Sequence, residues 1–216
     1  MFRPQEVLME RYQVLQMFAE GHFCEVYSAK DLHTNASVVV KKPKLQGKTD
    51  LRREYDLLRR LAPFSFSPTP LSYGSTANTE FYVMSHEGKS LGELVKNYTT
   101  GFNETTNTLI LYHTLLAVQA IHEVGVSHCD ITVMNVIVPI SAQKGRLLLI
   151  DYGASGDITA SSRRRDVLSV LTMIGWMDDH LFCDPDGNHN PEIEDLIKMI
   201  EDEPGFNPSE SFQWEE

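Results

Sequence analysis

An aspartate and an asparagine five residues apart, followed by an aspartate–glycine turn, constrain this chain more than any other feature. The loop that holds the first pair reads His-Cys-Asp-Ile-Thr-Val-Met-Asn over residues 128–135, and the turn reads Asp-Tyr-Gly over residues 151–153. Apolar runs at residues 136–138 and 147–150 lie between them and are typical of short buried strands. We therefore expect two carboxylates and one amide on two loops that short strands link.

Phosphoryl transfer uses this set of groups. It needs one carboxylate beside the attacking hydroxyl, and an amide with a second carboxylate to hold Mg²⁺ on the phosphates. Either motif is short enough to occur by chance, and a lone aspartate is more often a helix cap or a surface charge. Their order along the chain and the apolar runs beside them together favour the catalytic interpretation.

The apolar pattern predicts a β-rich first part. Two strands joined by a turn at Gly21 are predicted over residues 12–30, and further strands over residues 36–41 and 81–84. Residues 63–70 contain three prolines and are predicted to form a loop. One helix, which Thr49 or Asp50 can cap, interrupts these strands. Its apolar stripe consists of Leu51, Tyr55, Leu58 and Leu61.

Helices dominate the prediction for the second part. A long helix is expected from Glu104 to Glu123, where Gly125 ends it. Another helical block is expected to begin near Asp166, and a further helix over residues 192–200. The apolar positions of the long helix include Leu109, Leu116 and Ile121.

Composition places the chain among soluble globular proteins, with 42% apolar and 23% charged residues. A length of 216 residues suits one domain or two small lobes. The three cysteines are an odd number without C-x-x-C spacing, which disfavours zinc and a disulfide framework. The start has no apolar signal core, and no run approaches the roughly 18 residues of a membrane span. We expect a cytoplasmic or nuclear protein with no membrane partner.

The net charge of −11 is unevenly spread. Residues 176–216 hold 13 acidic residues against the single Lys198, whereas residues 1–175 hold 17 acidic and 18 basic residues. This acidic extension disfavours non-specific nucleic-acid binding. A role in an RNA-linked complex stays open, because a basic patch on the nearly neutral body could contact RNA. The run Arg163-Arg164-Arg165 is by default a solvated helix start.

Residues 120–130 read Ala-Ile-His-Glu-Val-Gly-Val-Ser-His-Cys-Asp and resemble the L-H-x-x-G-[IV]-x-H-R-D signature of the protein-kinase superfamily. The resemblance covers about residues 12–175. It implies an α+β, bilobal, protein-kinase-like fold, with a small β-rich N-lobe over residues 1–87. A reduced helical C-lobe with the catalytic loop would follow over residues 88–200, and residues 201–216 would form an acidic tail that we expect to be mobile.

The resemblance assigns roles to five residues. Asp130 would accept or orient the proton of the attacking hydroxyl, while Asn135 and Asp151 would bind Mg²⁺. Lys41 ends a run that resembles the V-A-I-K strand, and it would neutralise ATP phosphates while the helix residue Glu54 holds it. Lys42 competes for this role if the strand register shifts by one residue.

The same resemblance implies an ATP site in the N-lobe. The stretch from residue 19 to residue 26 resembles a glycine-rich turn in which Ala19 and Cys24 replace the outer glycines. The alternative interpretation of this turn is an ordinary hairpin. The alternative for Met84 is a methionine that only packs in the core. The residues expected to contact ATP are Gly21, Val26, Val39, Lys41, Met84, Ser85 and Glu87.

Several departures point to a small atypical kinase. Cys129 replaces the signature's arginine, Thr132 stands where serine/threonine kinases usually carry a lysine, and no A-P-E segment separates Gly153 from Asp166. The pattern resembles the compact kinase of the KEOPS tRNA-modification complex and, more loosely, the RIO kinases. Control by activation-loop phosphorylation is therefore not expected, and a protein partner could complete the reduced C-lobe.

The leading hypothesis is an ATP- and Mg²⁺-dependent phosphotransferase, either a serine/threonine kinase or an ATPase. One alternative is a pseudokinase, a nucleotide-binding interaction module that works through its surfaces. A further alternative is a small-molecule kinase of the aminoglycoside-phosphotransferase type, which shares the H-x-D-x-x-x-x-N loop. The sequence does not identify the substrate, which could be a protein or a small molecule.

Overall fold

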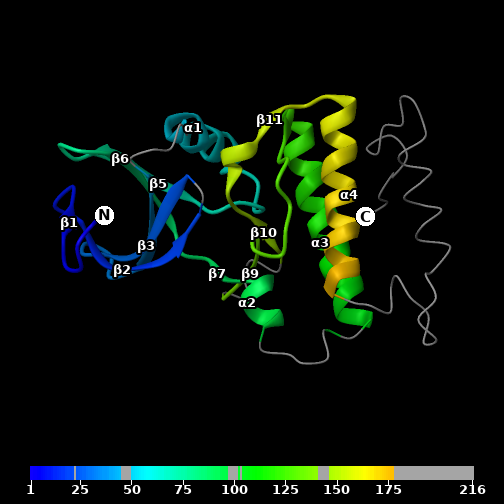
Figure 1. Ribbon diagram of the computed structural model, residues 1–216, viewed down its shortest axis with the longest axis horizontal. Helices are drawn as coiled ribbons and strands as arrows, with labels where there is room; N and C mark the ends of the chain where they lie inside the picture. The colour runs from blue at the N-terminus through cyan, green and yellow to red at the C-terminus, as the bar shows by residue number, and fades with distance from the viewer. Residues whose placement is uncertain (22, 45–49, 97–101, 103, 141–145, 178–216) are drawn as a thin grey trace. The chain divides into compact units, whose positions relative to one another are not determined.

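A computed structural model describes residues 1–21, 23–44, 50–96, 102, 104–140 and 146–177 of the chain (Figure 1). The chain divides into two compact units, Met1–Glu87 and Gly88–Glu216. The helix predicted over residues 192–200 and the tail over residues 201–216 lie outside the described residues, as does the cap candidate Thr49.

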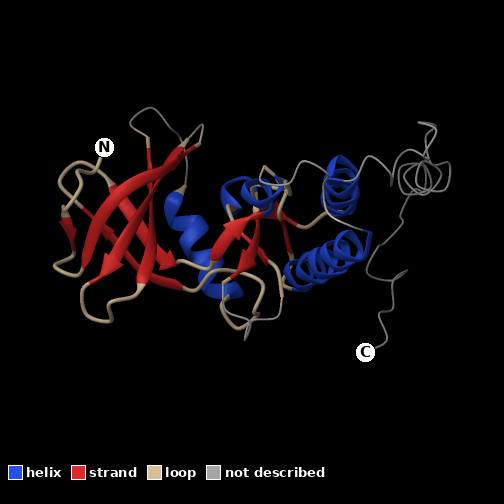
Figure 2. Ribbon diagram, turned by 90° about the horizontal axis from the view of Figure 1, so that it is seen from below, coloured by secondary structure: helices blue, strands red, loops and turns tan. Residues whose placement is uncertain are grey.

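The first unit is a sheet with one helix. Among the described residues the sheet has six strands, all antiparallel to their neighbours, in the order β1-β2-β3-β4-β6-β5. Figure 2 shows these strands in red. The elements are β1 (Val7–Leu8), β2 (Tyr12–Glu20), β3 (Cys24–Asp31), β4 (Ser37–Pro43), α1 (Leu51–Leu61), β5 (Pro70–Ser75) and β6 (Glu80–Ser85). The predictions of strands over residues 12–30, 36–41 and 81–84 are confirmed.

Alternation along β4 separates the two faces of this sheet. Val38 and Val40 lie in the apolar core that also holds Tyr12, Tyr27 and Phe81. Val39 and Lys41 point to the opposite face. On that face the register pairs Val26 with Lys41, Val39 with Met84, and Lys41 with Tyr82. Residues directly opposite each other in an antiparallel pair share a face, so the sheet itself gathers the expected nucleotide residues.

Helix α1 begins with a side-chain cap, because Asp50 Oδ1 accepts a hydrogen bond from Arg53 N at 2.9 Å. Its buried residues are Leu51, Glu54, Leu57, Leu58 and Leu61. Three of the four residues of the predicted apolar stripe, Leu51, Leu58 and Leu61, are buried. Tyr55 is half-buried, and its ring centroid lies 5.4 Å from that of Tyr73 and 5.9 Å from that of Tyr82.

Strand β5 was not predicted, because its first residue is Pro70 and the segment before it is rich in proline. A proline has no N–H for a ladder, yet β5 is the last strand of the sheet, where one side needs no partner. The predicted loop over residues 63–70 therefore ends one residue early, where Pro70 pairs with Met84.

The second unit combines helices with short strands. Helices α3 and α4 run side by side (Figures 1 and 2). The elements are β7 (Gly88–Ser90), α2 (Leu91–Val95), α3 (Glu104–Glu123), β8 (Val126–Ser127), β9 (Val136–Pro139), β10 (Leu148–Leu149), a 3-10 turn (Tyr152–Ala154), β11 (Gly156–Asp157) and α4 (Ala160–Met177). The α+β prediction is confirmed. Among the described residues, no helix is both long and apolar enough to cross a membrane.

The bounds predicted for α3 are confirmed, and Gly125 follows it with a φ of 81°. Its expected apolar face is only partly buried: Ile121 is 1% exposed, whereas Leu109 is 53% exposed. Helix α4 begins at Ala160, six residues before Asp166, where we had expected its start. A hydrogen bond from Ser162 N to Thr159 Oγ1 (3.0 Å) begins the helix there.

Gly88 is the first residue of β7. Strand β7 pairs with β9, and Gly88 lies opposite Pro139. A Cβ atom added to Gly88 would lie 2.0 Å from the carbonyl oxygen of Val138. Only glycine permits this close backbone approach.

Candidate active site

The register of β4 distinguishes its two adjacent lysines. Lys41 Nζ lies 2.7 Å from Glu54 Oε1 of α1, and both side chains are buried. Lys42, on the opposite face, has its Nζ 2.9 Å from Glu25 Oε2 and 5.7 Å from the centroid of the Phe2 ring. The sheet therefore places Lys41, and not Lys42, on the face of Val26 and Val39.

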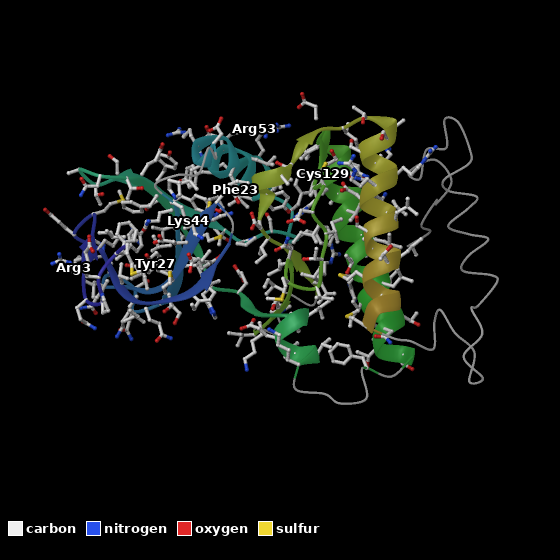
Figure 3. All side chains as sticks on the ribbon, in the orientation of Figure 1. Arg3, Phe23, Tyr27, Lys44, Arg53 and Cys129 are labelled. Carbon is white, nitrogen blue, oxygen red and sulfur yellow. The ribbon has the colours of Figure 1, made fainter. Side chains whose placement is uncertain are left out.

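The remaining nucleotide candidates of the first unit lie on or beside the same sheet. Val39 and Met84 are buried and Val26 is half-buried. Gly21 N donates a hydrogen bond to Cys24 O at 2.9 Å, which closes the turn between β2 and β3. Phe23, in this turn, is 61% exposed (Figure 3).

Polar groups at the end of β6 already form hydrogen bonds within the chain. Ser85 N donates to Thr69 O at 2.9 Å, and Thr69 N donates to Ser85 Oγ at 2.8 Å. Ser85 Oγ in turn donates to the Glu87 carboxylate. The N–H of Ser85, one of the residues expected to contact ATP, is therefore already engaged within the chain.

In the second unit, Asp130 and Asn135 are joined directly. Asn135 Nδ2 donates to Asp130 O at 2.9 Å and to Asp130 Oδ2 at 3.0 Å. Both partners are acceptors, so the amide nitrogen faces Asp130 and the amide oxygen is left for another group. Asp130 is exposed and Asn135 is half-buried.

Carboxylate and amide oxygens are suitable Mg²⁺ ligands, and Mg²⁺ in phosphoryl-transfer sites takes one or two carboxylates together with substrate phosphates. Asp151 and the Asn135 amide oxygen fit that chemistry. The described residues contain no cluster of three or more His, Cys, Asp or Glu side chains that could hold a metal ion. A Mg²⁺ ion held by Asp151 and Asn135 would take its remaining ligands from phosphate oxygens and water.

Asp166 of α4 fixes the backbone of the loop before Asp130. It is 0% exposed and accepts hydrogen bonds from His128 N (2.8 Å), Cys129 N (2.7 Å) and His122 Nε2 (2.9 Å). Cys129 (Figure 3) has a φ of 65°, a left-handed conformation that is unfavourable for a residue with a Cβ atom. We had placed Asp166 only at a helix start, because its partners lie 37 to 44 residues away in the sequence.

His128 connects this loop to the segment before Asp151. Its Nε2 lies 3.0 Å from Ile150 O, and its Nδ1 lies 3.3 Å from Asp130 N. A carbonyl only accepts and a backbone N–H only donates, so Nε2 carries the proton and Nδ1 accepts. The side chain is 0% exposed, and burial lowers the pKa of His128. The ring is therefore neutral.

This neutral histidine predicts acid sensitivity. Because the pKa of His128 is lower in the folded chain, the unfolded chain binds more protons below about pH 6.5, and stability falls as the pH drops. One such group contributes a slope of up to about 1.4 kcal/mol per pH unit. Unfolding free energies measured from pH 5 to 7 should therefore fall less steeply in His128→Asn than in the wild type. Equal slopes would contradict the neutral ring.

The Asp-Tyr-Gly turn is held beside the same histidine. Asp151 has a left-handed φ of 64°, and Gly153 N lies 3.4 Å from its Oδ1. Ile150 N donates to Asn135 O at 2.9 Å. The Tyr152 ring is buried, with its centroid 4.9 Å from that of His128. Burial raises the pKa of Tyr152, whose hydroxyl has no hydrogen-bond partner among the described residues.

The Tyr152 hydroxyl predicts a stabilising substitution. Removing a buried polar group without a partner relieves its desolvation cost, so Tyr152→Phe should raise the free energy of unfolding by about 1 kcal/mol. The matched control is Tyr27→Phe, because the Tyr27 hydroxyl accepts from Phe2 N at 3.1 Å and donates to Glu25. Tyr27→Phe should lower the free energy of unfolding by about 1 kcal/mol, as measured by thermal or urea unfolding. Equal losses in both variants would mean that the Tyr152 hydroxyl has a partner after all.

Comparison with known proteins adds the family context. The sequence profile of the protein kinase domain matches residues 12–177. The chain is 28% identical to Serine/threonine-protein kinase PITSLRE of Drosophila melanogaster, over 82% of this chain and 19% of that protein. It is 28% identical to Cyclin-dependent kinase 10 of Bos taurus, over 67% and 41% of the two chains. It is 27% identical to Serine/threonine-protein kinase prpf4B of Dictyostelium discoideum, over 74% of this chain and 21% of that protein. The chain thus spans less than half the length of each of these relatives.

Proposed function

Since the chain belongs to the protein kinase domain family, we propose that it is an ATP- and Mg²⁺-dependent phosphotransferase that acts on a hydroxyl group. The contact between Asp130 and Asn135 is the observation that carries the proposal. It places an exposed carboxylate beside an amide whose oxygen takes no part in the contact. Phosphoryl transfer depends on positioning and charge stabilisation, and these are the groups it needs.

Each residue has a distinct role in this proposal. Asp130 orients the acceptor hydroxyl and takes its proton. Asn135 and Asp151 hold Mg²⁺, which when bound neutralises the charge on the phosphates. Lys41 interacts with the α/β-phosphates, and Glu54 fixes its ammonium group. Val26, Val39 and Met84 offer an apolar surface for the base, while Gly21 lets the turn approach the phosphates.

We further propose a minimal type of kinase, close in pattern to the KEOPS-complex kinase and the RIO kinases. Helix α4 begins only seven residues after Gly153, and β11 lies between them, paired with β8. The stretch between Gly153 and α4 is therefore too short to hold a long regulatory segment. Cys129 and Thr132 support the same assignment, since neither offers the positive charge of a conventional serine/threonine kinase at its position.

A nucleotide-binding module without transfer is the second candidate. Ala19 and Cys24 favour it, because each puts a Cβ atom where a glycine-rich turn would leave backbone N–H groups open to phosphate.

The test is turnover of ATP by the full chain with Mg²⁺. Phosphate release and autophosphorylation would be followed with wild type, Asp130→Asn and the control Asp157→Asn, an exposed carboxylate of β11. Loss of the base should reduce turnover by about 10²- to 10⁴-fold, while the control remains near wild type. Protein, aminoglycoside and water acceptors would distinguish the substrate classes. Nucleotide binding without turnover for any acceptor would favour the second candidate.

A further inference from the structure

Three side chains form a row across the sheet of the first unit, on the face that holds Lys41. Tyr82 of β6 lies directly opposite Lys41 of β4, and Tyr73 of β5 lies directly opposite Tyr82. Residues directly opposite each other in antiparallel strands share a face, so the row crosses three neighbouring strands. Helix α1 packs against β5 and β6, the strands that supply the two tyrosines. The row therefore lies beside α1.

Two adjacent residues of α1 contact different members of this row. Glu54 Oε1 lies 2.7 Å from Lys41 Nζ. The ring centroid of Tyr55 lies 5.4 Å from that of Tyr73 and 5.9 Å from that of Tyr82, with interplanar angles of 50° and 43°. These distances are in the range of attractive aromatic pairs. Because Glu54 and Tyr55 are neighbours on one helix, the aromatic contacts fix the position from which Glu54 reaches Lys41.

Tyr73 has further contacts that hold its ring against α1. The guanidinium carbon of Arg52, three residues before Tyr55 on the helix, lies 4.9 Å from the Tyr73 ring centroid, which is a cation–π distance. Arg52 Nε donates to Asp56 Oδ2 at 3.0 Å, which orients the guanidinium group. The Tyr73 hydroxyl donates to the Glu80 carboxylate. Tyr73 therefore joins β5 to α1 through two residues of the helix.

We propose that Tyr55 and Tyr73 are positioning residues that hold α1 so that Glu54 stays paired with Lys41. They act through this pair, and not through a contact with nucleotide or acceptor. A lysine held in this way keeps its ammonium group in place for the phosphates, so loosening α1 slows phosphoryl transfer. That catalytic consequence rests on the proposed function, whereas the positioning of Lys41 does not.

Chemical labelling of lysines tests the positioning without any activity readout. The full chain would be treated with an amine-reactive ester, and fragmentation mass spectrometry would separate the adjacent sites. Tyr73→Leu removes the ring and its contacts with α1, so labelling of Lys41 should rise about tenfold as the helix opens more often. Lys42 is the internal control. It is buried beside Glu25 on the opposite face of β4, and its labelling should stay at the wild-type level.

Two further variants complete the labelling test. Tyr73→Phe keeps the ring and loses only the hydroxyl, so Lys41 should label as in the wild type. Tyr55→Leu leaves Arg52 beside the Tyr73 ring, so it should raise the labelling of Lys41 by a smaller factor, again without a change at Lys42. No rise at Lys41 in either leucine variant, or rises at both lysines in both of them, would overturn the proposal. Equal rises in Tyr73→Phe and Tyr73→Leu would also overturn it.

ATP turnover tests whether the positioning acts through Glu54. Tyr73→Leu should lower kcat about tenfold, while Tyr73→Phe stays near wild type. Adding Tyr73→Leu to Glu54→Gln should lower kcat no further than Glu54→Gln alone, because residues that act as one unit are not additive. Additive losses would contradict action through Glu54. A wild type without turnover would contradict the proposed function, and the labelling of Lys41 would still decide whether the tyrosines position α1.

Discussion

Asp166→Ala is expected to lower the free energy of unfolding of the second unit by about 3 to 5 kcal/mol. The Asp166 carboxylate is fully buried and accepts from His128 N, Cys129 N and His122 Nε2. Alanine leaves these buried donors without an acceptor, and each pays its desolvation cost. Urea unfolding followed by circular dichroism measures the loss. Asp157→Ala, which removes an exposed carboxylate of the same unit, should change stability by less than about 0.5 kcal/mol.

A second substitution tests whether Asp166 also holds the strained backbone of Cys129. Glycine adopts a φ of 65° without the Cβ clash, so Cys129→Gly in the Asp166→Ala background should recover about 1 kcal/mol. A loss in Asp166→Ala no larger than that of the Asp157 control would mean that other groups fix the loop.

Lys41→Met is expected to lower the free energy of unfolding by about 3 to 5 kcal/mol, because it leaves the buried Glu54 carboxylate without its partner. Lys41 Nζ and Glu54 Oε1 are 2.7 Å apart, with side chains 5% and 2% exposed. The double variant Lys41→Met/Glu54→Leu replaces both charges with apolar groups and should return close to wild-type stability. A double-mutant cycle in urea measures the coupling between the two residues.

The chain offers a matched control for burial. Lys44 Nζ and Glu20 Oε1 are also 2.7 Å apart, but their side chains are 28% and 55% exposed. Lys44→Met should cost less than about 1 kcal/mol, because solvent screens an exposed pair. Equal costs in Lys41→Met and Lys44→Met would contradict the importance of burial at Lys41. The double variant also separates stability from catalysis, since it should fold well and still lack ATP turnover.

Local patterns predict the longer elements of this fold. Strands β2, β3, β4 and β6 follow from apolar runs with turn residues between them, and α3 from helical periodicity with Gly125 at its end. Strands β1, β7, β8 and β11 have two or three residues each, too few for a period to appear. Their pairing depends on where the rest of the chain places them. Strand β5 was not predicted, because prolines argue against a strand and are tolerated only at an edge such as this one.

In the candidate site, too, some contacts follow from local sequence patterns and others do not. Strand alternation and the position of Glu54 on the next helix lead to the Lys41–Glu54 contact. Neither period nor motif connects Asp166 to the loop before Asp130, because those hydrogen bonds need α4 to pack beside α3. The engagement of Ser85 N by Thr69 is equally invisible in the sequence, since it depends on a strand that was not predicted.

Thermal unfolding of the full chain with ATP and Mg²⁺ tests the central proposal most directly. Nucleotide at 100 times its Kd should stabilise the wild type by about 2.7 kcal/mol. In Asp151→Asn the Mg²⁺-dependent part of this gain should disappear, while the stability without nucleotide stays near wild type. No stabilisation by any nucleotide, with either Mg²⁺ or Mn²⁺, would contradict the proposed phosphotransferase site.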